Sequence, residues 1–230
     1  MIEKRRREAA LDIKNATLHY LGYNGQSLTD EEDRRIDEAI AEVIEVACPK
    51  TVHRVFPLSH VKENLTVPAE LDLNYSSLHE LLADSADVLI LAATLGLELD
   101  RRLRYYARTD AARLVLMDAA ASALVERVCD ELQEALPYDS YTFRFSPGYG
   151  DVPLLLQKQI VRVLETPKRI GMTLTRSLLM IPQKSITGIV GIGGGPKEPT
   201  CKGCALFEHC DFRMRGTVCY ATNEKKPDRD

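Results

Sequence analysis

The apolar residues of the 230-residue chain recur with a helical period in several stretches. One helix is predicted to begin where Thr29 and Glu32 have the spacing of a capping box, and to end before Pro49. Ser77 and Glu80 have the same spacing, which predicts a second capping box at the start of a short helix. Further helices are predicted over residues 3–21, 110–135 and 153–164.

Short apolar or β-branched runs between these stretches predict strands. Residues 51–58 are rich in β-branched side chains, and residues 87–93 and 185–192 are short apolar runs. Residues 141–146 alternate aromatic with polar side chains, so a strand is expected with its aromatics on one face and Thr142 on the other. Because helices and strands occur in blocks, the pattern favours an α+β fold, a twisted and mainly antiparallel sheet with helices packed against it.

A run of glycines marks a change in the character of the chain. Residues 193–196 read Gly-Gly-Gly-Pro directly after the last predicted strand, which is typical of a linker. The remaining residues contain few large apolar side chains and four of the six cysteines. We therefore expect one main domain over residues 1–192, followed by a linker and a cysteine-rich tail over residues 193–230.

Composition and charge narrow the possible functions. The chain is 45% hydrophobic and 28% charged, as is usual for a globular protein. A net charge of −4 does not suit nucleic acid, and the basic run at residues 4–7 is interpreted as a solvated helix face. No secretory signal is evident, and the apolar residues 88–97 reach about half the length of a membrane span. A cytoplasmic protein that binds neither nucleic acid nor membrane is expected.

A possible ligand site lies at residues 144–151, which read Arg-Phe-Ser-Pro-Gly-Tyr-Gly-Asp. A guanidinium beside a glycine turn can hold a carboxylate through two parallel hydrogen bonds, and glycines let a ligand approach the backbone. The alternative is a strand-to-helix corner in which Arg144 has no ligand. These residues alone leave both interpretations open.

The segment Arg144–Tyr149 resembles the Arg-x-x-x-Gly-Tyr signature of the activation domain of cobalamin-dependent methionine synthase. Residues 170–175 with Ser177 resemble the block that follows in that family. The likeness extends to Met180, Pro182, Ser185, Gly188, residues 20–23 and residues 92–96. It covers roughly residues 15–192 and implies the fold of that domain.

The resemblance also implies a function. Such a domain binds S-adenosylmethionine and supports reductive methylation of cob(II)alamin carried by the synthase. The expected partners are therefore a cobalamin-binding methionine synthase and an electron donor. The chain would be an accessory subunit of a methyltransferase system in methionine biosynthesis, and no catalytic residue is assigned to it.

Four residues would contact the ligand if the family's roles apply at matching positions. Arg144 would bind the carboxylate of the methionine moiety, while Gly148 and Tyr149 would shape the groove. Glu126 aligns with a helix glutamate that faces the ligand in the family, and the alternative is an ordinary exposed helix residue. The full-length enzymes continue after Gly-Tyr with Pro-Ala-Cys-Pro, whereas this chain has Gly-Asp-Val-Pro at residues 150–153.

The tail carries a second candidate site. Its cysteines have the spacing Cys201-x2-Cys204-x5-Cys210-x8-Cys219. In a reducing compartment such a cluster suits an iron–sulfur cluster or a structural zinc, and unligated cysteines are the third possibility. Two rival functions follow. One is an iron–sulfur electron-transfer or corrinoid-reducing protein, and the other is a scaffold subunit with a zinc-stapled tail.

Overall fold

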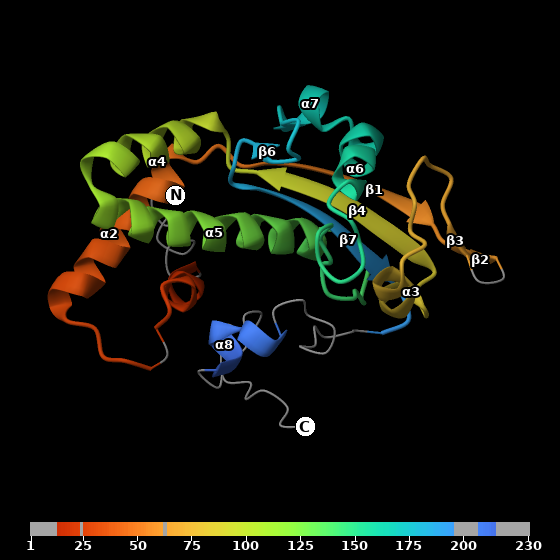
Figure 1. The fold of residues 1–230 in the computed structure, drawn as a ribbon, viewed down its shortest axis with the longest axis horizontal. Coiled ribbons are helices and arrows are strands. Elements are labelled where there is room, and N and C mark those ends of the chain that lie inside the picture. The colour runs from red at the N-terminus through yellow and green to blue at the C-terminus, as the bar shows by residue number, and fades with distance from the viewer. Residues whose placement is uncertain (1–12, 24, 62–63, 196–206, 215–230) are drawn as a thin grey trace. The chain divides into compact units, whose positions relative to one another are not determined.

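The computed structural model describes residues 13–23, 25–61, 64–195 and 207–214 (Figure 1). Residues 13–20 are helical. The remaining helices are α2 (Asp30–Val46), α3 (Ser76–Leu82), α4 (Leu97–Thr109), α5 (Ala111–Glu134), α6 (Leu156–Leu164), α7 (Thr166–Arg169), η1 (Phe207–His209) and α8 (Asp211–Met214). The strands are β1 (Lys50–Pro57), β2 (Ser59–Val61), β3 (Asn64–Thr66), β4 (Asp87–Thr94), β5 (Thr173–Leu174), β6 (Met180–Ile181) and β7 (Ser185–Ile192).

The chain forms two compact units, each built from three segments that are separated in the sequence. The first unit consists of Met1–Val52, Ala92–Leu136 and Glu165–Ile186. The second consists of His53–Leu91, Pro137–Leu164 and Thr187–Asp230. The predicted boundary after residue 192 stays a prediction, because most of the residues beyond it lie outside the described part of the chain.

Helices α2, α4 and α5 pack against one another in the first unit, as Figure 1 shows. The predicted capping box of α2 is confirmed. The Thr29 hydroxyl accepts the Glu32 backbone N–H (3.3 Å), and the Glu32 carboxylate accepts the Thr29 backbone N–H (2.9 Å). The apolar face of α2 is buried through Ile36, Ala39, Ile40 and Val43. Alanines on α5, among them Ala119, Ala120, Ala121 and Ala123, are buried as well.

Three strands form a sheet in the order β1-β4-β7. Hydrogen bonds at the strand ends give their directions. Cys48, before β1, donates to the Leu95 carbonyl after β4, and Leu58, after β1, donates to the Ala86 carbonyl before β4. This pattern makes β1 and β4 antiparallel, and the pairs Leu95–Lys184 and Ala86–Ile192 do the same for β4 and β7. Pairs β2–β3 and β5–β6 are also antiparallel, so the predicted α+β fold with an antiparallel sheet is confirmed.

Two sequence predictions about local structure are wrong. Residues 141–146 do not form a continuous strand, since they make only isolated bridges, among them the antiparallel bridges of Tyr141 to Ile192 and of Phe145 to Ile189. Thr142 is buried, and its hydroxyl oxygen accepts the Gly191 backbone N–H (2.8 Å). Helix α6 begins at Leu156 rather than at residue 153, since residues 154 and 155 form a turn.

A further wrong prediction concerns the start of α3. Ser77 and Glu80 do not form a capping box, because the helix begins at Ser76 and its N-cap residue is Tyr75. The phenol of Tyr75 makes no capping hydrogen bond. The acceptor for the first backbone N–H groups comes instead from Asp151, 75 residues beyond Ser76.

No helix in the described ranges is both long and apolar enough to cross a membrane.

Candidate functional site

Arg144 lies between two points at which the chain is fixed to β7. Before the arginine, the Thr142 N–H donates to the Gly191 carbonyl (3.0 Å). After it, Phe145 and Ile189 exchange backbone hydrogen bonds of 2.9 and 2.8 Å, and the Ser146 hydroxyl donates to the Thr187 carbonyl (3.0 Å). Arg144 itself is half-buried. The backbone direction on either side of the arginine is therefore set by the neighbouring strand.

Gly188 makes room for the aliphatic part of Arg144. A Cβ built at residue 188 would lie 2.7 Å from Cγ and 2.8 Å from Cδ of Arg144. Such distances are well inside van der Waals contact, so the arginine stem lies directly over the bare backbone of β7. The missing side chain at Gly188 thus determines where the arginine stem lies.

The glycine turn follows within the same unit. Gly148 and Gly150 have φ angles of +98° and +55°, values that side-chain-bearing residues rarely adopt. The Val152 N–H donates to the Tyr149 carbonyl (3.1 Å), and the Gly148 N–H donates to the Val152 carbonyl (2.9 Å). Tyr149 is 64% exposed. The structure therefore brings Arg144, Gly148 and Tyr149 together in one corner, residues 144–151, whose tyrosine faces solvent.

Asp151 closes this corner. Its Oδ2 accepts the Ser76 backbone N–H (2.7 Å) and its Oδ1 accepts the Ser77 backbone N–H (3.0 Å). These bonds, led by the one from Ser77, lower the pKa of the Asp151 carboxyl to about 2. The carboxylate is ionised throughout the neutral pH range. Sequence reasoning did not single out this residue, because both of its donors are backbone groups more than 70 residues away.

Glu126 belongs to the first unit, where it is half-buried on α5. Arg144, Gly148 and Tyr149 belong to the second unit. The role of Glu126 stays a prediction made from the resemblance alone.

The predicted metal ligands fall mostly outside the described residues. This holds for Cys201, Cys204 and Cys219, whereas Cys210 is described as a half-buried free thiol just before α8. Within the described ranges no three His, Cys, Asp or Glu side chains are grouped in a way that could hold a metal ion. The cysteine cluster therefore remains an untested prediction.

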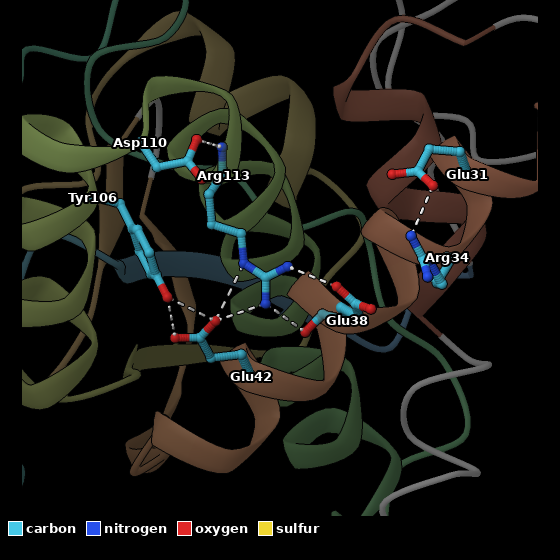
Figure 2. A network of polar contacts seen from close by, with 7 residues as sticks. All are labelled: Glu31, Arg34, Glu38, Glu42, Tyr106, Asp110 and Arg113. Carbon is cyan, nitrogen blue, oxygen red and sulfur yellow. Dashed lines mark hydrogen bonds and ion pairs between the residues drawn. The ribbon is translucent and has the colours of Figure 1, made fainter.

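The first unit also contains a polar network that the sequence did not reveal (Figure 2). Glu42 on α2 accepts hydrogen bonds from Arg113 (2.7 and 3.2 Å), from the Tyr106 hydroxyl (2.9 Å) and from Arg102 (2.9 Å). The side chains of Glu42 and Arg113 are only 15% and 18% exposed. Arg113 also lies 3.6 Å from the Glu38 carboxylate. The network connects α2, α4 and α5 through side-chain hydrogen bonds and ion pairs, so we interpret its role as structural.

Burial raises the pKa of Glu42, but hydrogen bonds from Arg113 and Tyr106 outweigh this effect and leave the pKa below its ordinary value. The carboxylate is consequently ionised at neutral pH, which suits its position opposite two guanidinium groups.

Comparisons with known proteins agree with the resemblance seen in the sequence. Residues 133–197 match the family described as vitamin B12 dependent methionine synthase, activation domain. This range includes Arg144, Gly148 and Tyr149, but neither Glu126 nor the tail cysteines. No curated protein matches the chain.

A solved structure extends the likeness to most of the chain. The MetH reactivation domain bound to AdoHcy is 18% identical in sequence, with a TM-score of 0.64. The likeness covers 93% of this chain and 84% of that domain. The suspected resemblance is thus confirmed: residues 133–197 carry the sequence pattern of the activation domain of vitamin B12-dependent methionine synthase, and the chain has the fold of a methionine synthase reactivation domain.

Proposed function

We propose that the chain binds S-adenosylmethionine and supports reductive methylation of cob(II)alamin on a cobalamin-dependent methionine synthase. The observation that carries this proposal is the 144–151 corner, in which a fixed arginine stands beside a glycine turn. The corner lies inside the segment that matches the activation-domain family. The similar solved domain is described as bound to AdoHcy, the product that remains when S-adenosylmethionine loses its methyl group.

Arg144 contributes the charge that selects an amino-acid ligand. Its guanidinium can donate two parallel hydrogen bonds to the ligand carboxylate, an arrangement that a lysine ammonium does not reproduce. Because Gly188 and the Phe145–Ile189 pair fix the stem and the backbone, these parts of the arginine need little reorganisation on binding.

The backbone of the corner contributes shape. Because Gly148 and Gly150 adopt positive φ angles, the backbone turns tightly at these two glycines and presents Tyr149 at the surface. The exposed Tyr149 ring offers an apolar surface beside them. The roles of Gly148 and Tyr149 are therefore binding roles, and no proton transfer is assigned to either.

The overall reaction needs one electron from a donor and the methyl group of the sulfonium, and it yields methylcobalamin on the partner and S-adenosylhomocysteine. The contribution of this chain is placement, since a methyl group held beside its acceptor reacts far more readily than one free in solution. The proposal assigns the protein to the cytoplasm, to methionine biosynthesis and to an accessory role beside the synthase.

Isothermal titration calorimetry with S-adenosylmethionine and S-adenosylhomocysteine tests the binding claim. Arg144→Ala is expected to weaken binding roughly 10–100-fold, because charge-assisted hydrogen bonds contribute about 1.5–3 kcal/mol. Arg162→Ala is the matched control, since Arg162 is an exposed arginine of the same unit that pairs with Glu70. Equal affinities of the Arg144→Ala variant and the unchanged protein would remove the arginine from the site.

Reconstitution tests the reaction. Mixing the protein with a cob(II)alamin-form methionine synthase, a chemical reductant and S-adenosylmethionine is expected to give the absorption spectrum of methylcobalamin. The mixture without this protein is the control. Equal yields with and without the protein would contradict the proposed role.

The cysteine spacing favours a second, compatible role. We infer that residues 193–230 form a separate tail in which Cys201, Cys204, Cys210 and Cys219 bind a metal, either as an iron–sulfur cluster that relays the electron or as a structural zinc. Anaerobically purified protein is expected to absorb broadly near about 400 nm if it carries a cluster, whereas zinc is colourless. Elemental analysis showing neither metal would leave the tail cysteines without this role.

A further inference from the structure

We propose that Asp151 is a positioning residue, which holds the 144–151 corner in its binding conformation by accepting hydrogen bonds from the N-terminus of α3. The inference rests on the proposed function, since it concerns the same ligand. It adds a residue of this chain to the site that neither the family signature nor the exposed tyrosine indicates.

Two consecutive amides of α3 attach to the Asp151 carboxylate. Each oxygen of the Asp151 carboxylate accepts one backbone N–H, from Ser76 at 2.7 Å and from Ser77 at 3.0 Å. These are short, charge-assisted bonds made to two consecutive amides, so they fix the direction of the carboxylate as well as its position. In the opposite direction, the Asp151 N–H donates a longer bond (3.5 Å) to the Ser77 hydroxyl.

Gly150, the residue before Asp151, packs closely against α3. A Cβ built at Gly150 would lie 2.3 Å from the Ser77 hydroxyl oxygen and 3.1 Å from its Cβ. The backbone of Gly150 therefore lies directly against α3. Gly150 also has a φ of +55°, which side-chain-bearing residues rarely adopt. A side chain at this residue would therefore be disfavoured both by the contact with Ser77 and by the backbone conformation.

The attachment at Asp151 restricts the glycine turn of the corner. Gly148 and Gly150 flank Tyr149 and are the most conformationally free residue type in the chain. The arginine end of the corner is fixed by β7 through the Phe145–Ile189 hydrogen bonds. Asp151 fixes the opposite end, so the two glycines lie between two anchored points of one unit.

The benefit to α3 does not by itself explain the arrangement. Tyr75 supplies no capping acceptor, so α3 gains from any carboxylate near its first turn. An acceptor on a local residue would serve the helix equally well. An acceptor placed directly after the Gly-Tyr-Gly turn also restricts the conformation of the turn. A measurement of ligand binding reports this restriction of the turn, because the turn belongs to the proposed site.

The test is the kinetics of S-adenosylhomocysteine binding, followed by surface plasmon resonance on the full chain. If Asp151 positions the corner, Asp151→Asn lowers the fraction of molecules in the binding conformation, because one of the two acceptor oxygens becomes an NH2 group, which cannot accept the backbone N–H opposite it. The association rate constant is then expected to fall about tenfold while the dissociation rate constant is unchanged. Asp139→Asn is the matched control, since Asp139 is an exposed aspartate of the same unit.

Each outcome decides between the two proposals. Faster dissociation with unchanged association would mean that Asp151 contacts the ligand, which overturns the positioning role. Normal rates in Asp151→Asn, combined with weak binding by Arg144→Ala, would sink the role of Asp151 and leave the proposed function intact. No binding by the unchanged protein would remove both. If Asp151→Asn does not fold, Gly150→Ala disturbs the same attachment without removing the charge, and the same loss of association rate is expected.

Discussion

The replacement Gly188→Ala tests whether the bare backbone of β7 positions Arg144. The new Cβ would lie 2.7 Å from Cγ and 2.8 Å from Cδ of the arginine, and 3.4 Å from Cδ1 of Leu91. Carbon atoms in ordinary contact are about 3.5–4.0 Å apart, so the arginine stem must move by about 1 Å. The contact to Leu91 needs almost no adjustment.

The expected magnitude follows from this geometry. Overpacking costs about 1–3 kcal/mol of unfolding free energy, and the lower end applies here because the arginine side chain can rotate. In the Arg144→Ala background Cγ and Cδ are absent, so the clash disappears. Gly188 does not have a positive φ, and the added Cβ then restricts the unfolded chain. In that background Gly188→Ala is expected to be neutral or to stabilise by about 0.5 kcal/mol.

Urea unfolding of four proteins, followed by far-ultraviolet circular dichroism at 25 °C, measures this coupling. The four are the unchanged chain, each single variant and the double variant, and a coupling free energy of at least about 1 kcal/mol is expected. Ligand affinity should follow the same pattern, with Gly188→Ala weakening binding only when the arginine is present. An equal change in unfolding free energy in both backgrounds would refute the claim that residue 188 acts through the arginine.

Two further predictions concern charged groups. Glu42→Gln should lower the unfolding free energy by about 2 kcal/mol in urea titrations, because it leaves Arg113 largely buried opposite a neutral amide, whereas Glu38→Gln should cost less than about 0.5 kcal/mol. The pKa of the Asp151 carboxyl is lower in the folded protein than in the unfolded chain. The contribution of this carboxylate to the free energy of unfolding is therefore complete above about pH 4 and is lost as the pH falls towards about 2. Acid titration of the Asp151→Asn variant should lack this part of the pH dependence, and an unchanged profile would contradict it.

The sequence predicted those features that depend on neighbouring residues. The capping box of α2 joins Thr29 to Glu32, three residues away, and is present in the structure. Short apolar and β-branched runs predicted β1, β4 and β7, the block order of the elements favoured the antiparallel sheet, and helical periodicity predicted the long helix α5. The start of α3 was missed, because its capping oxygen belongs to Asp151 and no local pattern encodes an acceptor 75 residues away.

The same distinction applies to the candidate site. Arg144, Gly148 and Tyr149 occur within six consecutive residues, so one motif contains them all. The steric role of Gly188 and the Glu42–Arg113 pair depend on contacts between segments 44 and 71 residues apart. A sequence pattern identifies which residues are present, but the contacts that orient them arise only when distant segments pack together.

The position of β1 in the sheet has a consequence for solubility. Within the described residues β4 is its one strand neighbour in the β1-β4-β7 sheet, so its other backbone edge could act as a template for a strand of another molecule. The strand carries Lys50 and Arg54, both exposed, and it ends at Pro57, which has no N–H to donate. If two copies of the chain met along this edge, their Lys50 and Arg54 side chains would come together. The repulsion between these cations opposes aggregation along the edge.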